Sequence, residues 1–233
     1  MPNAIIFGYG GIGQALSHTL VSEGYQVMVV SRKPLHNTAT IRYEKLDTCS
    51  EKSSSQLIVL ISSYQPQLII NTIGMLHNTD CQPEKRVSKF DKECFTQSMA
   101  INFFPTVNIV KALDQALKRS DQLKFLVLSA RVSSMGDNKL GGWYSYRISK
   151  AALNMFVKNT SIEWQRNFPK CAIFGYHPGT VDTPLSQPYQ SRVSPKKLFS
   201  PQDACDKLMH VLDQLTINDS GYLFDWKGNK IEF

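Results

Sequence analysis

The sequence contains no long apolar run. Nowhere in its 233 residues does an apolar stretch approach the roughly 20 residues that a helix needs to cross a bilayer. The first apolar stretch, Asn3–Phe7, is too short for a signal peptide and has no basic residue in front of it. We therefore expect no membrane partner, and we predict that Asn3–Phe7 is a buried strand.

Cysteines are few and scattered. The chain has five, an odd number, and no two of them have the C-x-x-C spacing that is typical of zinc or redox sites. They are Cys49, Cys81, Cys94, Cys171 and Cys205. This pattern predicts reduced thiols, no metal site and a cytoplasmic protein.

Dense clusters of one charge are also missing, although the net charge is +7. Lysines and arginines are spread along the chain, and Lys85-Arg86 and Lys196-Lys197 are the nearest to clusters. No motif for recognising DNA or RNA accompanies them, so we expect a solvated basic surface and no nucleic-acid partner. Part of this positive charge is available to an anionic cofactor.

The chain does contain a regular alternation of apolar runs and segments with helical periodicity. The apolar runs, which we predict to be strands, cover residues 3–7, 26–31, 41–45, 68–71, 124–129, 171–177 and 222–225. The periodic segments, which we predict to be helices, cover residues 12–22, 50–61, 97–118, 144–168 and 201–215. This alternation predicts an α/β fold in which helices cover both faces of a doubly wound, seven-stranded parallel sheet.

Three segments lack either pattern. Residues 32–40 contain a proline and are too few for a crossover helix, so we predict a loop there. Residues 75–95 and 186–200 are polar and irregular, and we expect them at the rim of an active site. Their composition does not identify a substrate. No linker divides the chain, which predicts one domain over residues 1–233.

The first predicted strand leads into the run Gly-Tyr-Gly-Gly-Ile-Gly at residues 8–13, and a helix follows. Glycines in this context let the backbone approach a pyrophosphate, which the helix N-terminus attracts. The run predicts a Rossmann-type dinucleotide site, although a turn without a ligand has the same composition.

Ser31 and Arg32 end the second strand, where a cation favours the 2′-phosphate of NADP(H). The alternative is that Arg32 is a solvated loop residue.

Tyr146 and Lys150 lie in the longest predicted helix, and a spacing of four places them on one face. A tyrosine that exchanges protons at neutral pH needs its pKa lowered from about 10 to about 7, which is about 4 kcal/mol. An ammonium about 4 Å away supplies about that much at an effective dielectric near 20. The pair predicts a general acid/base, although such pairs are also common on protein surfaces.

Further motifs follow in a characteristic order. Residues 71–74 are Asn-Thr-Ile-Gly, residues 146–150 fit Tyr-x-x-x-Lys, and residues 178–183 are Pro-Gly-Thr-Val-Asp-Thr. With the glycine run, they make the chain resemble the short-chain dehydrogenase/reductase family over nearly its whole length. The sequence around residues 128–134 and 141–146 is most similar to the carbonyl-reductase-like branch that includes the C-factor and sniffer proteins.

The resemblance implies a role for each matching residue. Tyr146 would give or take the proton, Lys150 would lower its pKa and bind the nicotinamide ribose, and Asn102 would hold a proton-relaying water. Asp47 would contact the adenine, or it is an ordinary turn residue or helix N-cap. The implied cofactor-binding residues are Gly8, Gly10, Gly11, Ile12, Gly13, Ser31, Arg32, Asp47, Asn71, Gly74, Tyr146, Lys150, Pro178, Gly179, Val181 and Thr183.

The chain departs from the family pattern at two positions. Phe7 stands where the first loop glycine is usual, and Ala130 stands where the family has its catalytic serine. We favour Ser134 as the replacement hydroxyl, and Ser133 and Ser129 remain alternatives. We expect His177, a strand-end residue, to pack or hydrogen-bond locally.

These features imply hydride transfer between NADP(H) and a small carbonyl or alcohol substrate. Ala130 motivates an alternative, in which the chain binds NADP(H) as a sensor or interaction protein without the chemistry. The apolar residues of the helices at 97–118 and 144–168 permit a homodimer or homotetramer without requiring either.

Overall fold

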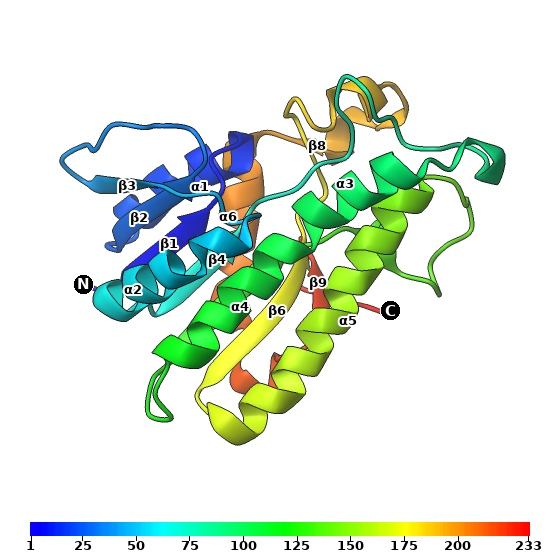
Figure 1. Ribbon diagram of the computed structural model, residues 1–233. Helices are drawn as coiled ribbons and strands as arrows, with labels where there is room; N and C mark the ends of the chain where they lie inside the picture. The colour runs from blue at the N-terminus through cyan, green and yellow to red at the C-terminus, as the bar shows by residue number, and fades with distance from the viewer.

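The centre of the molecule is one eight-stranded sheet (Figure 1). The computed structural model describes residues 1–233 apart from the side chain of Arg192. From edge to edge the strands are β10 (Lys230–Ile231), β9 (Leu223–Asp225), β6 (Cys171–His177), β5 (Leu123–Leu128), β4 (Leu68–Asn71), β1 (Asn3–Phe7), β2 (Gln26–Ser31) and β3 (Ile41–Lys45). All neighbouring strands are parallel except β9 and β10.

Helices cover both faces of the sheet (Figure 1). One face carries α1 (Gly11–Ser22) and α6 (Pro201–Gln214), whose Leu16 and Leu208 are buried in one core cluster. The other face carries α2 (Ser54–Tyr64), α4 (Phe104–Ala116) and α5 (Tyr144–Asn167). The remaining helix, α3 (Lys92–Asn102), packs against α5. None of the helices described is long and apolar enough to span a membrane.

The strand order places a binding position between β1 and β4. The chain passes from β1 through β2 to β3, and then returns to β4 on the opposite side of β1. Loops therefore leave the carboxyl ends of β1 and β4 in opposite directions. In open parallel sheets, ligands bind in the crevice that this reversal creates.

The predicted α/β fold is confirmed, and its strands agree with the structure to within one residue at each end. An eighth strand, β10, was not predicted because two residues are too few to show a period. A small separate pair, β7 (Thr180–Val181) and β8 (Leu198–Phe199), was missed for the same reason. Residues 32–40 contain no helix, as predicted.

Two helix predictions were wrong in detail. The single helix predicted at 97–118 is two helices, α3 and α4, which meet at Phe103. Pro105 lies in the first turn of α4, where its missing N–H costs nothing, but it cannot continue a preceding helix. The helix predicted at 50–61 begins with the 3₁₀ turn Glu51–Ser53, and α2 then continues to Tyr64.

The prediction of five reduced thiols was also wrong. Cys81 and Cys94 form a disulfide, while Cys49, Cys171 and Cys205 are free. The polar segment after β4 folds back onto the start of α3, where the Asp91 carboxylate accepts a hydrogen bond from the backbone N–H of Cys94 (2.8 Å). Sequence spacing did not indicate this contact, because it depends on how a segment without periodicity folds. The predicted cytoplasmic location depended on reduced thiols and stays a prediction.

Candidate active site

The glycine run forms the tight turn between β1 and α1. Gly8 has a φ of +97°, and a Cβ there would lie 2.6 Å from the Thr72 hydroxyl oxygen. A Cβ on Gly13 would lie 2.3 Å from the carbonyl oxygen of Gly8. Only glycine fits these two positions. The turn therefore forms even though Phe7 stands where the family usually has its first loop glycine. Gly10 caps α1 without a side-chain hydrogen bond from the described residues, so the first N–H groups of the helix are available to an anion.

The Pro-Gly motif lies against this turn. A Cβ on Gly11 would be 2.8 Å from the methyl group of Thr183, so residues 178–183 reach the start of α1. Gly179 has a φ of +79°, and a Cβ there would meet the Phe199 ring at 2.7 Å. Val181 is buried, and its carbonyl accepts the Thr183 hydroxyl at 3.3 Å. The glycine turn and the Pro-Gly motif, which are far apart in sequence, thus form adjoining walls of the candidate site.

Ser31, Arg32 and Asp47 lie at the carboxyl ends of β2 and β3: Ser31 is the last residue of β2, Arg32 follows it, and Asp47 follows β3. The Ser31 hydroxyl oxygen accepts the N–H of Lys33 at 3.2 Å, and Arg32 is exposed. Burial and the Asp47 carboxylate raise the pKa of Cys49, while the Arg32 guanidinium opposes that rise, so both charged groups lie near this thiol. The Asp47 carboxylate accepts the N–H of Cys49 (3.0 Å) in a turn, and the N-cap that follows is Ser50.

Asn102, Gly74 and Lys150 converge beyond the ends of β4 and β5. The Asn102 side-chain amide exchanges two hydrogen bonds with the backbone of Met75, at 2.7 and 2.9 Å. The Lys150 ammonium is buried and donates to the carbonyl of Leu128 at 2.9 Å. A Cβ on Gly74 would lie 3.3 Å from Asn102 Oδ1 and 3.4 Å from Lys150 Nζ. Glycine at this position leaves room for both groups.

Asn102 and Asn71 are both buried and hydrogen-bonded. Asn102 Nδ2 also lies 3.1 Å from the hydroxyl oxygens of Ser98 and Ser149, so its amide holds α3, α5 and the segment after β4 together. Asn71 donates to the Thr106 hydroxyl (3.0 Å) and accepts the N–H of Ile73 (3.0 Å). The side chain of Asn102 is therefore occupied, and the relay of a water through this residue stays a prediction.

Burial dominates the electrostatics of the Tyr146–Lys150 pair. It raises the pKa of Tyr146 to about 12 and lowers the pKa of Lys150 to about 8. Burial sets both directions, and the lowering of the phenol pKa by Lys150 stays a prediction. The physical reason is that desolvation favours the uncharged form of both groups, and the ammonium donates to the Leu128 carbonyl.

The three candidate serines make different hydrogen bonds. The Ser129 hydroxyl donates to Asn154 Oδ1 (2.6 Å), and the Ser133 hydroxyl donates to the Ala130 carbonyl (2.5 Å). Ser134 Oγ only accepts, from the N–H of Asp137 at 3.1 Å. Among the described contacts, Ser134 is thus the candidate whose hydroxyl proton has no acceptor.

Glu84, which positions the helix that carries Tyr146, was not predicted from the sequence. Glu84 is 6% exposed, and its carboxylate accepts both the backbone N–H of Ser145 (3.1 Å) and the Ser145 hydroxyl. Its carbonyl accepts the N–H of Trp143. The segment around Glu84 has no periodicity, so no sequence signal indicated that this charge is buried.

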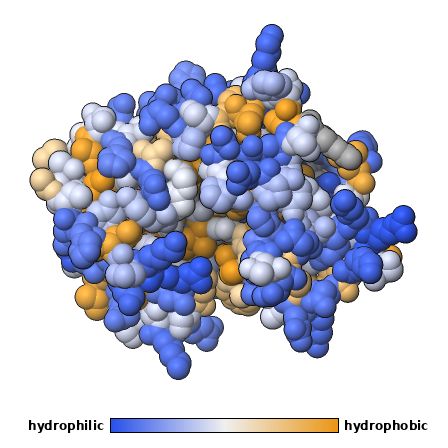
Figure 2. All heavy atoms as spheres, turned by 90° about the horizontal axis from the view of Figure 1, so that it is seen from above, coloured by the Kyte–Doolittle hydropathy of each residue, from blue (hydrophilic) through white to orange (hydrophobic). Residues whose placement is uncertain are grey.

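The face of the molecule above the carboxyl ends of the strands is indented (Figure 2). Apolar atoms lie at the floor of the indentation, and hydrophilic side chains surround it. The glycine turn, the Pro-Gly motif and the Asn102–Lys150 cluster all follow strand ends at this edge. A nicotinamide dinucleotide is chemically suited to such a site, because the glycine cradle and the uncapped helix fit a pyrophosphate.

A family model described as short chain dehydrogenase matches residues 2–194. The chain belongs to the short-chain dehydrogenase family. The resemblance inferred from the sequence motifs is thereby confirmed. Members of this family are oxidoreductases that use nicotinamide cofactors on small molecules, so this short-chain dehydrogenase is assigned a general oxidoreductase role.

Curated relatives match this short-chain dehydrogenase in part or in full. A 1-hydroxy-2-glutathionyl-2-methyl-3-butene dehydrogenase of Rhodococcus sp. (strain AD45) is 31% identical over 135 residues, which are 58% of this chain and 57% of that protein. The C-signal protein of Myxococcus xanthus is 27% identical over 135 residues, covering 58% of this chain and 76% of that protein.

Solved structures share the whole fold. The carbonyl reductase Sniffer of D. melanogaster superposes with a TM-score of 0.83 at 18% identity, covering 100% of both chains. An NADPH-bound carbonyl reductase from chicken fatty liver has a TM-score of 0.82 at 18% identity, covering 100% of this chain and 99% of that one. At these identities, the similarity establishes the fold.

Proposed function

We propose that this short-chain dehydrogenase transfers a hydride between NADP(H) and a small carbonyl or alcohol substrate, with Tyr146 as general acid/base. The observation that carries the proposal is the convergence of Asn102, Gly74 and Lys150 at the strand ends, one helical turn from Tyr146 and beside the glycine cradle. NADP-bound structures among those with the same fold agree with this cofactor.

In this proposal, each group of cofactor-binding residues contacts a different part of the dinucleotide. Gly8, Gly10, Gly11, Ile12 and Gly13 hold the pyrophosphate against the N-terminus of α1. Ser31 and Arg32 bind the 2′-phosphate, and Asp47 contacts the adenine. Asn71 and Gly74 shape the wall after β4, Lys150 binds the nicotinamide ribose, and Pro178, Gly179, Val181 and Thr183 hold the carboxamide side. When bound, the nicotinamide supplies or accepts the hydride.

Tyr146 holds the proton that the reduction consumes. Because burial raises its pKa to about 12, the phenol is protonated at neutral pH and can donate to the substrate oxygen as negative charge develops there. Lys150, with a pKa of about 8, is mostly protonated at pH 7 and stabilises the resulting phenolate. The unused hydroxyl proton of Ser134 is the best candidate to steady the substrate oxygen in place of a serine at position 130.

Tyr146→Phe tests the assignment. With NADPH and a panel of aldehydes, ketones and quinones, kcat should fall at least about 100-fold because the proton donor is gone. The NADPH dissociation constant, measured by fluorescence, should change less than about twofold. Tyr144→Phe, on the same helix, is the control and should retain activity. Unchanged turnover in Tyr146→Phe refutes the role of Tyr146.

Ala130 supports a second candidate, a short-chain dehydrogenase that binds NADP(H) without turning it over. Its position after β5 lacks the family's hydroxyl, and Ser129 and Ser133 are held by Asn154 or by the backbone. NADPH binding without oxidation by any member of the substrate panel would favour this candidate.

A further inference from the structure

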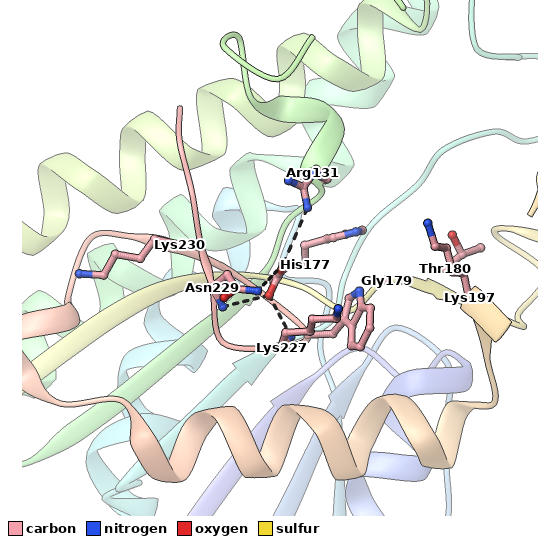
Figure 3. A pocket seen from close by; sticks show the side chains of 10 residues that line it. Arg131, His177, Gly179, Thr180, Lys197, Lys227, Asn229 and Lys230 are labelled. Atoms are coloured by element: carbon pink, nitrogen blue, oxygen red, sulfur yellow. Dashed lines mark hydrogen bonds and ion pairs between the residues drawn. The ribbon is translucent and has the colours of Figure 1, made fainter. Parts of the chain in front are cut away.

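A cavity of about 590 Å³ lies beyond the carboxyl ends of β5, β6 and β9 (Figure 3). Its size suits a small molecule. It is lined by Arg131, His177, Gly179, Thr180, Lys197, Asp225, Trp226, Lys227, Asn229 and Lys230. None of the catalytic residues proposed above is among them.

The lining is strongly positive. It contains four cationic side chains, Arg131, Lys197, Lys227 and Lys230, and one carboxylate, Asp225. Figure 3 shows Arg131 on one side of His177, and Lys197 beside Thr180 on the other. Cations that surround a concave site focus their field within it, which raises the local concentration of anions.

Two of these cations already have partners, and two do not. Arg131 pairs with Asp137 at 2.6 Å and lies 3.8 Å from Asp225. Lys230 turns toward Asp219, at 3.5 Å. Neither Lys197 nor Lys227 forms an ion pair with any of the described residues. Their charges are available to a ligand.

The single carboxylate is used to shape the cavity. Asp225 is 6% exposed, and its Oδ1 accepts the N–H groups of Lys227 (2.9 Å) and Asn229 (3.0 Å). The N–H of Gly228 also bonds to the Asp225 carbonyl, at 2.9 Å. These bonds fix the turn between β9 and β10, which holds Lys227 at the rim. The buried carboxylate therefore organises the turn, and the accessible charge of the lining is cationic.

A packed aromatic wall supports the same rim. The Trp226 ring contacts the Phe199 ring edge to face, with centroids 4.9 Å apart. Lys227 Nζ lies 4.9 Å from the centroid of Trp226. The turn that carries Trp226 and Lys227, like Lys197, follows residue 194, where the match to the family model ends. The cavity is thus built largely by a part of the chain that the family model does not match.

We propose that this cavity binds a small molecule with at least two anionic oxygens, such as a carboxylate or phosphate group, at a site that adjoins the proposed dinucleotide site at Gly179. Lys197 and Lys227 supply the unpaired charge, and Arg131 contributes the guanidinium nitrogens that Asp137 leaves free. The anionic oxygens belong either to an acidic substrate or to a free anion. A substrate is one of the two sources because Gly179, which lines the cavity, also belongs to the Pro-Gly motif that we propose to hold the nicotinamide.

Calorimetry with citrate and with inorganic phosphate tests the site. Titrations are run with NADPH at saturation, so that the dinucleotide site is filled. The double variant Lys197→Gln/Lys227→Gln should bind citrate at least about tenfold more weakly than the natural chain. Lys111→Gln/Lys118→Gln, which removes the same charge from exposed positions on and after α4, should change the affinity less than about twofold. Equal losses in both double variants, or no binding by the natural chain, would overturn the proposal.

Turnover then identifies the source of the anion. Keto acids are compared with their methyl esters in the natural chain and in Lys197→Gln/Lys227→Gln. A rise in KM for the acids alone supports an acidic group of the substrate, whereas citrate binding with equal KM effects on acid and ester supports a free anion. Because calorimetry needs no turnover, a chain that binds citrate but reduces nothing refutes the proposed function and retains the site.

Discussion

Desolvation of Tyr146 and Lys150 determines how far each of the two side chains is protonated at neutral pH. It separates the two pKa values, to about 12 for the phenol and about 8 for the ammonium. At neutral pH the phenol therefore carries its proton, which suits an acid that protonates a developing alkoxide. Use of the phenolate as a base requires additional positive charge close to the oxygen. The residue chemistry thus favours the reductive direction of the proposed reaction.

We expect Arg32 to set the cofactor preference of the proposed dinucleotide site. Its guanidinium can form two charge-assisted hydrogen bonds to a 2′-phosphate, worth about 1.5–3 kcal/mol. Arg32→Asp removes these bonds and adds a repelling charge, so NADPH affinity should fall by about 10- to 100-fold while NADH affinity falls much less. Fluorescence titration with both cofactors measures the ratio. Arg42→Gln, whose guanidinium pairs with Glu44 on β3, is the control. An unchanged ratio in Arg32→Asp would show that Arg32 is a solvated loop residue.

At the scale of single residues, the sequence predicted only those groups that lie close together along the chain. Tyr146 and Lys150 share a helix, so a separation of four residues was sufficient to place them together. The choice among Ser129, Ser133 and Ser134 was not determined, because it depends on contacts with Asn154, 21 or 25 residues further along the chain. The direction of the Tyr146 pKa shift depends on burial, which the motif does not contain.

The start of α5 shows how one element depends on another. Trp143, the N-cap residue, has a φ of +53° and makes no side-chain cap, so the first turn of α5 lacks a local acceptor. The Glu84 carboxylate takes this role from 61 residues away. An anion at a helix N-terminus also interacts favourably with the helix dipole. The polar segment after β4 is therefore part of the support for Tyr146.

Glu84→Gln should weaken this connection. A neutral amide loses the charge and turns one of its two acceptors into a donor that faces Ser145, so unfolding free energy should fall by about 1–2 kcal/mol. Urea denaturation followed by circular dichroism measures the change. Glu163→Gln, at an exposed position of α5, should stay within about 0.5 kcal/mol of the natural chain. If both variants unfold at the same urea concentration, the Glu84 carboxylate does not stabilise α5.

Strands and helices were predictable where burial produces a continuous apolar pattern in the sequence. The central strands β1, β4 and β5 are buried over almost their whole length, and apart from Asn3, Asn71 and Lys124 they read as apolar runs. The junction of α3 and α4 was missed because apolar periodicity continues through it, although Pro105 is a recognised stop signal. The Cys81–Cys94 bond joins a segment without a pattern to a helix, and spacing alone cannot predict it.

At the scale of the whole molecule, one edge of the sheet carries every proposed site. In the proposed assignment, the ends of β1, β2 and β3 bind the adenine and the phosphates, the ends of β4 and β5 with α5 serve the nicotinamide and proton transfer, and the ends of β6 and β9 line the cationic cavity. Parallel strands make this possible because all their carboxyl ends lie together.

His177 links this edge to the stability of the whole fold. Burial, helped by the charge of Arg131 and opposed by Asp225, lowers the pKa of His177 to about 4. In the unfolded chain the pKa is about 6.5, so between pH 6.5 and 4 the unfolded chain binds the extra proton. The contribution of His177 is fully present above pH 6.5 and is lost as the pH falls toward 4, by at most about 3 kcal/mol.

Urea denaturation at pH 7, 6, 5 and 4 measures this loss. His177→Gln has no proton to gain, so its unfolding free energy should fall less steeply over this range than that of the natural chain. His18→Gln, at an exposed position of α1, should keep the natural slope. Because His177 also lines the cationic cavity, saturating citrate should raise the stability of the natural chain by binding only the folded state. Parallel curves for His177→Gln and the natural chain would mean that His177 is already solvated in the fold, and that the end of β6 does not carry the acid sensitivity.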